Sequence, residues 1–103
     1  MTYADYKLGK AIRALSETHA RNRDWLGSAE VYLFTRLRNE DVPREVRVHF
    51  EEFQAEIERL QAKYGSPAMH IPAALLTEEE VIRLMNLFAD VVASWPGSED
   101  MYA

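Results

Sequence analysis

Carboxylate side chains are the groups in this sequence whose spacing is most typical of a functional site. Those expected on the exposed flanks of two helices, over residues 43–64 and 77–95, are Glu45, Glu51, Glu52, Glu56, Glu58, Glu79 and Asp90. Carboxylates held on stiff helices imitate a row of phosphates, so they attract proteins whose own sites are basic and speed association by long-range steering. We take these seven as candidate partner-binding residues. A surface that only keeps the protein soluble is the alternative interpretation.

A histidine among these carboxylates raises the question of a metal site. His49, Glu52 and Glu56 lie along one flank of the first of these helices, and helical carboxylates do bind metals in bundles. A bundle metal centre, however, draws ligands from several facing helices, and neither His19 nor His70 belongs to a Glu-x-x-His motif. We predict no metal ion and no other cofactor.

Basic residues accompany the same flank. Arg59 and Lys63 follow the carboxylates, so weak ion pairs on a solvated helix are the simpler interpretation of the row. Motifs for catalysis are missing as well. The four glycines are scattered, which excludes a Gly-rich phosphate loop, and no serine stands in a nucleophile elbow. We therefore predict a protein that is not an enzyme.

Charge is unevenly divided along the chain. Residues 1–47 contain nine Lys or Arg and seven Asp or Glu, a balance of +2, whereas residues 48–103 contain three and ten, a balance of −7. Phosphate would be repelled by the acidic half, so we expect no direct binding of nucleic acid and a basic protein as the partner. The arginines of the first half each have an acidic residue within a few positions, which indicates a mixed, solvated surface.

Composition places the chain among small globular domains. Its 103 residues, 48% of them hydrophobic, fit one domain with a single core. The lack of cysteine excludes disulfides and thiolate metal sites and is typical of a reducing compartment, so we expect the cytoplasm. The N-terminus has no apolar run typical of a signal peptide, and no segment reaches the roughly 18 consecutive apolar residues of a membrane span.

Apolar periodicity in the first half predicts two helices. Thr2 can cap the first helix, with Asp5 near its positive end. Its apolar stripe, at three- and four-residue steps, is Leu8, Ala11, Ile12, Leu15 and His19. After a turn, Asp24 or Ser28 can cap a second helix, whose apolar residues are Leu26, Ala29, Leu33 and Leu37. VYLFT at residues 31–35 is also typical of a strand, but the chain offers no partner strand, so helix is the prediction.

A third helix is predicted by a clean apolar seam. The breaker NEDVP at residues 39–43 precedes it, with Asp41 placed to cap, and Gly65 ends it. Its apolar residues follow steps of four and three, typical of packing against another helix at a shallow angle: Val46, Phe50, Phe53, Ile57, Leu60 and Tyr64. In the connection over residues 66–76 we expect a helical turn after Pro72. The residues of this connection expected to pack on the bundle are Met69, Ile71, Leu75 and Leu76.

The strongest local signal belongs to TEEEVIRLMNLFADVVASW at residues 77–95. Thr77 and Glu80 form a capping box, Leu76 and Val81 form a hydrophobic staple, and WPG ends the helix. One apolar face consists of Val81, Leu84, Met85, Phe88, Val91, Val92 and Trp95. Ile82, Leu87 and Ala89 widen this face to about 220°. Either the helix is central, which we favour, or part of the arc is exposed for a partner.

These elements together predict an all-α fold. We expect a single-domain bundle of about four helices over residues 1–97, with a short tail at residues 98–103. The third and fourth helices are joined by the apolar, proline-containing connection.

Acidic helical segments such as EEFQAEIERL at residues 51–60 and TEEE at residues 77–80, in a short chain without cysteine or catalytic motifs, resemble the small bacterial immunity proteins that neutralise a partner toxin, often a nuclease. The resemblance implies tight binding of the toxin, with its active site or a neighbouring surface occluded, and no cofactor. The expected partner is therefore a basic protein such as a toxin domain, with no direct nucleic acid and no membrane. The alternative is a non-enzymatic helical adaptor or regulator that self-associates, as a homodimer, through the apolar surface of the fourth helix at Ile82 and Leu87.

Overall fold

The computed structural model describes residues 2–17, 22–66 and 71–97, and within these ranges the chain forms five α-helices, three 3₁₀ turns and no strand. The α-helices are α1 (Tyr3–Glu17), α2 (Asn22–Leu26), α3 (Ala29–Thr35), α4 (Arg47–Tyr64) and α5 (Glu78–Ser94). The 3₁₀ turns are η1 (Asn39–Asp41), η2 (Arg44–Val46) and η3 (Ala73–Leu75). The predicted all-α bundle is confirmed, including the helical state of residues 31–35. The predicted tail lies outside the described residues.

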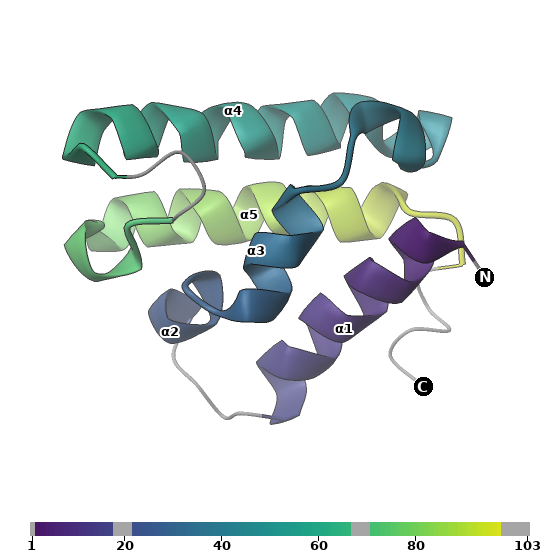
Figure 1. The fold of residues 1–103 in the computed structure, drawn as a ribbon, viewed down its shortest axis with the longest axis horizontal. Helices are drawn as coiled ribbons and strands as arrows, with labels where there is room; N and C mark the ends of the chain where they lie inside the picture. Colours follow the sequence, from purple (N-terminus) through teal and green to yellow (C-terminus); the bar gives the residue numbers. More distant parts are fainter. Residues whose placement is uncertain (1, 18–21, 67–70, 98–103) are drawn as a thin grey trace.

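The two long helices, α4 and α5, lie side by side along the longest axis of the molecule (Figure 1). They run antiparallel, because Lys63 near the end of α4 contacts Glu80 at the start of α5, whereas Glu56, earlier in α4, contacts Arg83, later in α5. The helices α1, α2 and α3 pack against one another and cover one side of α5.

Several helix ends follow the predicted local signals. Thr2 and Asp5 bond each other's backbone N–H groups at the start of α1, and Thr77 and Glu80 do the same at the start of α5. Both ends are therefore capping boxes, as the sequence predicts for α5. Gly65 ends α4 with a left-handed backbone, φ = 65°, which glycine adopts at little cost.

The predicted second helix is two helices, α2 and α3, in the structure. Ser28 accepts a hydrogen bond from the Val31 N–H and starts α3, which resets the helical phase. Leu33, predicted as a core residue, is therefore 44% exposed, and Ala29 is exposed as well. Val31 and Phe34 are fully buried in their place.

Asp41 also differs from its predicted role. It accepts a hydrogen bond from the Arg38 N–H, 3.1 Å away, and so caps η1 instead of α4. The chain then passes through η2 before α4 begins at Arg47, where no side chain provides a cap. The start of α4 thus has no side-chain cap, and η2, directly before it, contacts both α4 and α5.

The connection between α4 and α5 contains the predicted helical turn, η3, directly after Pro72. Leu76 is buried and Ile71 is partly buried against the core, as expected. Leu75 is 58% exposed, contrary to the prediction that it packs on the bundle. Met69 lies outside the described residues.

Phe34, on the short helix α3, lies at the centre of an aromatic core. Its ring centroid is 5.4 Å from that of Phe50 and 5.7 Å from that of Phe88, both edge to face, and 6.2 Å from that of Trp95. One side chain therefore joins α3 to α4 and to α5. The predicted seam of α4 is confirmed on the same core, buried at Val46, Phe50, Phe53, Ile57 and Leu60 and partly buried at Tyr64.

The apolar arc of α5 is covered on most of its width. The predicted face is buried at Val81, Leu84, Phe88, Val91, Val92 and Trp95 and partly buried at Met85. Of the residues that widen the arc, Leu87 is buried, whereas Ile82 is 57% exposed and Ala89 is exposed. Contacts with α2, η2 and α4 explain the wide arc, because α5 has neighbours on several sides. The favoured interpretation of a central helix is confirmed, with one exposed edge at Ile82 and Ala89.

Replacing Phe34 with alanine tests the aromatic core. Phe34→Ala leaves a cavity between three helices, so we expect the free energy of unfolding to fall by about 3–5 kcal/mol. Leu33→Ala, one position earlier on α3, is the matched control, and because Leu33 is 44% exposed we expect a loss below about 1 kcal/mol. Urea unfolding followed by tryptophan fluorescence measures both values. Equal losses would show that α3 presents a different face to the core.

Candidate protein-binding surface

Six of the seven predicted partner-binding carboxylates are exposed. They are Glu45 in η2, Glu51, Glu52 and Glu58 on α4, and Glu79 and Asp90 on α5. Glu56 is the exception, because only 6% of it is exposed. The six exposed carboxylates remain candidates for contact with a partner.

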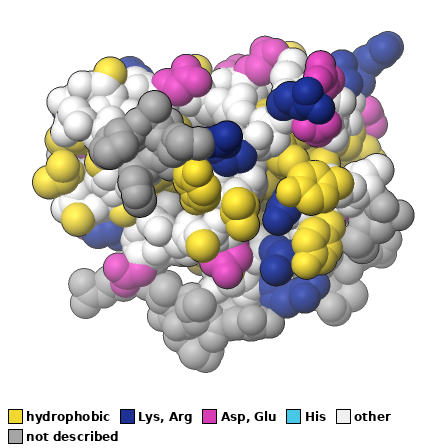
Figure 2. Space-filling view, viewed as in Figure 1, with side chains coloured by type: hydrophobic (Ala, Val, Ile, Leu, Met, Phe, Trp, Pro, Cys, Tyr) yellow, Lys and Arg dark blue, Asp and Glu magenta, His cyan; other side chains and the backbone are white. Residues whose placement is uncertain are grey.

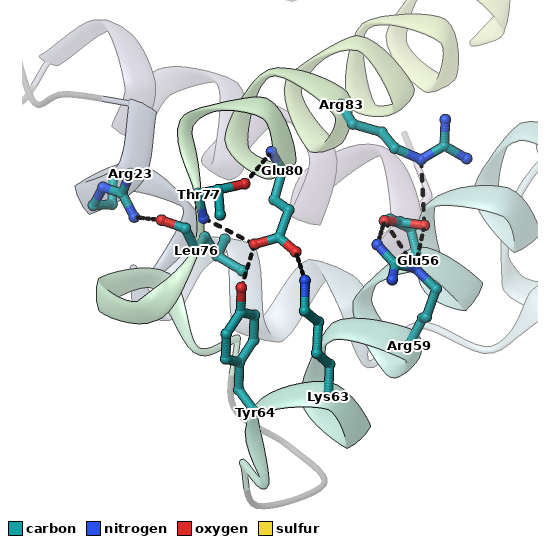
Figure 3. Close-up of polar contacts among 9 residues, drawn as sticks. All are labelled: Arg23, Glu56, Arg59, Lys63, Tyr64, Leu76, Thr77, Glu80 and Arg83. Atoms are coloured by element: carbon teal, nitrogen blue, oxygen red, sulfur yellow. Dashed lines mark hydrogen bonds and ion pairs between the residues drawn. The ribbon is translucent and has the colours of Figure 1, made fainter.

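Glu56 is buried between α4 and α5 and bound by two arginines. Its Oε1 lies 2.6 Å from Nη2 of Arg59, and its Oε2 lies 3.3 Å from Nε of Arg83 (Figure 3). The hydrogen bond from Arg59, helped by that from Arg83, lowers the pKa of the Glu56 carboxyl, although burial acts in the opposite direction. The prediction that Glu56 is displayed for a partner is therefore wrong. Its position at the edge of the α4 seam turns it inward, where it links the two long helices.

Glu80 is a second buried carboxylate, 8% exposed, and it does more than complete the capping box of α5. It accepts hydrogen bonds from Nζ of Lys63 at 2.7 Å, the hydroxyl of Tyr64 at 2.5 Å and the N–H of Thr77 at 2.8 Å (Figure 3). The bond from Lys63, followed by those from Tyr64 and Thr77, lowers the pKa of Glu80 to about 2. The last turn of α4 is thereby linked to the first turn of α5.

Arg23 of α2 holds the other side of the start of α5. Its Nη1 donates to the carbonyl oxygens of Ala73 at 2.7 Å and Leu76 at 2.5 Å, and its Nη2 lies 2.9 Å from Glu78 (the bond to Leu76 is drawn in Figure 3). The sequence places Arg23 only on a mixed, solvated surface. These partners are 50 to 55 positions away, so no local pattern could have revealed them.

The three cations of residues 48–103 are all bound to the two buried carboxylates. Arg59 and Arg83 bind Glu56, and Lys63 binds Glu80. In the described part of the chain, no ion pair involves the exposed carboxylates Glu45, Glu51, Glu52, Glu58, Glu79 and Asp90. The charge of these six carboxylates is therefore not balanced by an ion pair within the described residues.

Four of the exposed carboxylates share the side of the molecule on which Arg83 meets Glu56. At 3.6 residues per turn, Glu52 lies one turn before Glu56 on the same flank of α4. On α5, a carboxylate lies one turn before Arg83 and another two turns after it. We call this group the acidic face, and it consists of Glu45, Glu52, Glu79 and Asp90.

The remaining two carboxylates, Glu51 and Glu58, lie on the opposite flank of α4, as their spacing predicts. Glu51 accepts a hydrogen bond at 2.8 Å from the side-chain amide of Asn39 in η1, which leaves its charge in place. Acidic side chains are visible along the α4 edge of the molecule (Figure 2). The structure thus brings four of the seven predicted residues together and separates the other three.

The described residues form no cluster of three or more His, Asp or Glu side chains placed to hold a metal ion. His49 is partly buried, and its Nδ1 has no hydrogen-bond partner among the described residues. His19 and His70 lie outside them. In the same ranges, none of the helices has both the length and the apolar character needed to cross a bilayer.

Comparison with known proteins gives no family for the chain. No family model matches it, and no curated protein sequence or solved structure gives a significant match. The resemblance to immunity proteins therefore stays a prediction, and the function has to be inferred from the surface itself.

Glu80 predicts a specific loss of stability in acid. Its folded-state pKa of about 2 lies below the ordinary value of 4.5, so its contribution is fully present above pH 4.5 and is lost as the pH falls toward 2. Glu80→Gln keeps the shape and removes the charge. We expect this variant to unfold at a lower urea concentration than the wild type at pH 7, with the difference closing as the pH falls from 4.5 to 2.

The adjacent, exposed Glu79 provides the matched control for this measurement. Glu79→Gln should unfold close to the wild type at every pH, because its carboxylate has no ion pair among the described residues. If the destabilisation of Glu80→Gln persisted undiminished at pH 2, the ionised carboxylate would not be its cause.

Proposed function

We propose that this chain is a protein-binding domain that neutralises a basic partner, such as a toxin domain with nuclease activity, by covering the partner's basic surface with the acidic face. The supporting observation is that every cation of residues 48–103 is bound to a buried carboxylate. Glu56 and Glu80 hold those cations, so among the described residues no ion pair involves the four carboxylates of the acidic face, although the half-exposed Arg59 and Arg83 lie beside them. The proposal includes no catalytic step, metal ion or cofactor.

Rigidity is the second property of the acidic face that suits it to binding. Glu52 and Asp90 stand on the two long helices, and Glu56 links these helices through Arg83. Glu79 and Asp90 are eleven residues apart on α5, or about 16 Å. A protein that grips a nucleic-acid backbone carries cations over a comparable length. Fixed carboxylates attract such a surface from a distance and need little reordering on contact.

Two other interpretations of the surface predict different behaviour. A solubility surface carries the same charge but prefers no partner. Self-association through α5 relies on Ile82 and Leu87, but Leu87 is 9% exposed, so only Ile82, with the small Ala89 nearby, can contact another copy. An apolar patch of this size is ordinary for a monomer, and the acidic face is the stronger candidate.

Reversing two charges on the acidic face tests the proposal. A pull-down from the native host with the wild-type chain identifies the partner. We expect Glu52→Lys combined with Asp90→Lys to weaken binding of that partner by about tenfold or more at low salt, mainly through slower association. The variant should also lose most of the salt dependence of the association rate. Stopped-flow fluorescence measures the rate, and for a nuclease partner the inhibition of cleavage should fall in parallel.

Asp24→Lys combined with Glu40→Lys is the matched control, because it makes the same change in net charge on the exposed surface of α2 and η1. This variant should bind as the wild type does. Circular dichroism confirms that both variants keep their helices. If the captured partner binds the wild type and the Glu52 and Asp90 variant equally at low and high salt, the acidic face only keeps the protein soluble.

A further inference from the structure

The exposed side of α1 combines tyrosines with basic residues. Tyr3 is 65% exposed and Tyr6 is 48% exposed, whereas Leu8 and Ala11, on the other side of the helix, are fully buried. Hydrophobic and basic side chains lie together over α1 (Figure 2). We call the outward group the α1 stripe, and it consists of Tyr3, Tyr6, Lys7, Lys10 and Arg13.

Cation–π contacts hold the α1 stripe together. Nζ of Lys7 lies 5.2 Å from the centroid of the Tyr3 ring and 5.7 Å from that of Tyr6. Nζ of Lys10 lies 5.4 Å from the Tyr6 centroid. The contacts place ammonium groups beside exposed rings, so the stripe presents charge and apolar surface at once.

The positive charge of the α1 stripe is not cancelled within the described residues. No ion pair there involves its three cations. Asp5, a carboxylate of the same helix, is bound elsewhere, because it accepts hydrogen bonds from the Trp95 indole N–H at 2.7 Å and from the Thr2 N–H at 3.0 Å. From Tyr3 to Arg13 the stripe spans ten residues, or about 15 Å.

A complementary surface lies on the side of α4 that faces away from the core. Val48 is 64% exposed, and Ala55, two turns later, is exposed too. Glu52 flanks this apolar line on one side, and Glu51 and Glu58 flank it on the other. We call these five residues the outer face of α4. From Val48 to Glu58 it also spans ten residues, or about 15 Å. The exposed Arg59 follows Ala55 by one turn on the same face, with its guanidinium bound to Glu56.

We propose that the α1 stripe of one molecule binds the outer face of α4 of a second copy. Cations on one helix meet carboxylates on the other, and the exposed rings of the stripe cover the apolar line of Val48 and Ala55. The equal lengths allow the two helices to pair over their whole contact. A nucleic acid would also bring negative charge to the stripe, but the balance of −7 over residues 48–103 repels phosphate.

The two surfaces lie on different sides of the molecule, with α3 and α5 between α1 and α4 (Figure 1). They cannot meet within one molecule, and each copy can use both at once. Association is therefore head to tail. It continues to add copies unless the rotation that relates each copy to the next closes a ring. One pair of helices buries less than the roughly 1,000 Å² of a stable interface, so the contact exchanges with the monomer. Glu52 belongs to the acidic face as well, so a second copy competes with a basic partner for it.

Sedimentation velocity of the full chain over a concentration series at low salt tests this contact. The sedimentation coefficient of the wild type should rise with protein concentration, and about 0.5 M salt should return it to the monomer value. Lys10→Glu should weaken self-association by about tenfold or more, because it places a carboxylate against carboxylates. Arg36→Glu is the matched control. Arg36 is also exposed and lies 6.0 Å from a ring, that of Tyr32, but outside the α1 stripe, so this variant should associate as the wild type does.

Mixing two one-sided variants provides an independent test. Lys7→Ala with Lys10→Ala removes charge from the α1 stripe and keeps the outer face of α4. Glu52→Gln with Glu58→Gln removes charge from the outer face of α4 and keeps the α1 stripe. Each variant alone should sediment mainly as a monomer. The equimolar mixture should form a 1:1 dimer without larger species, because the intact stripe of one variant can bind only the intact outer face of the other.

A wild type that stays monomeric over the whole series overturns the proposal, as does equal loss of association in Lys10→Glu and Arg36→Glu. It is also overturned if the wild type is monomeric and a single-stranded oligonucleotide binds it but not Lys10→Glu. The stripe would then be a nucleic-acid site. Lys10 lies outside the acidic face, so failure here is distinct from failure of the partner-binding proposal.

Discussion

Two carboxylates buried at the contact between α4 and α5, Glu56 and Glu80, constrain the rest of the molecule. A buried carboxylate without a cation or other hydrogen-bond donors is unfavourable, and both of these accept from cations at the surface edge of the contact. Arg59, Lys63 and Arg83 are therefore held at the contact. The same ion pairs link α4 to α5, and among the described residues they leave Glu45, Glu52, Glu79 and Asp90 without an ion pair.

Features of the fold that are decided within one helical turn could be predicted from the sequence. The capping box of Thr77 and Glu80 and the end of α4 at Gly65 depend on neighbours in the chain, and both occur as predicted. The break between α2 and α3 depends on more than neighbours. Ser28 can start a helix or lie inside one, and in the structure it starts α3 in the phase that packs Phe34 against rings of α4 and α5. Leu33 was expected in the core because periodicity alone cannot supply that information.

Prediction of the candidate site from sequence is limited in the same way, even for two residues one turn apart. Glu52 and Glu56 are one turn apart on the same flank of α4, and helical spacing gives them the same prediction. They differ in what α5 places opposite them, because Arg83 reaches Glu56, 27 positions earlier in the chain. No local pattern marks that pairing. Sequence can thus predict that a helical flank is exposed. Predicting that a single carboxylate on that flank is neutralised requires knowing which residue of the neighbouring helix packs against it.

Cations of the first half of the chain bind different groups, and this explains why the molecule has two charged sides. Arg23 donates to backbone carbonyls of η3 and the turn before α5, and Nε of Arg47 donates to the Val42 carbonyl at 3.2 Å, so neither arginine cancels a buried carboxylate. Lys7 and Lys10 lie against tyrosine rings, which also leaves their charge in place. Positive charge therefore remains on α1, while negative charge remains on α4 and α5.

The two proposals meet at the same helices, because the proposed basic partner and the α1 stripe of another copy would both bind Glu52 of α4. The stripe supplies three cations and only a small apolar contact, so the proposed partner, with a larger basic surface, would bind more tightly and displace it. Two ligands that share Glu52 compete, so under both proposals self-association would lower the apparent affinity for the partner, and the partner would break the head-to-tail contact. Weak self-association would then occupy Glu52 at high protein concentration and still release it to a stronger competitor.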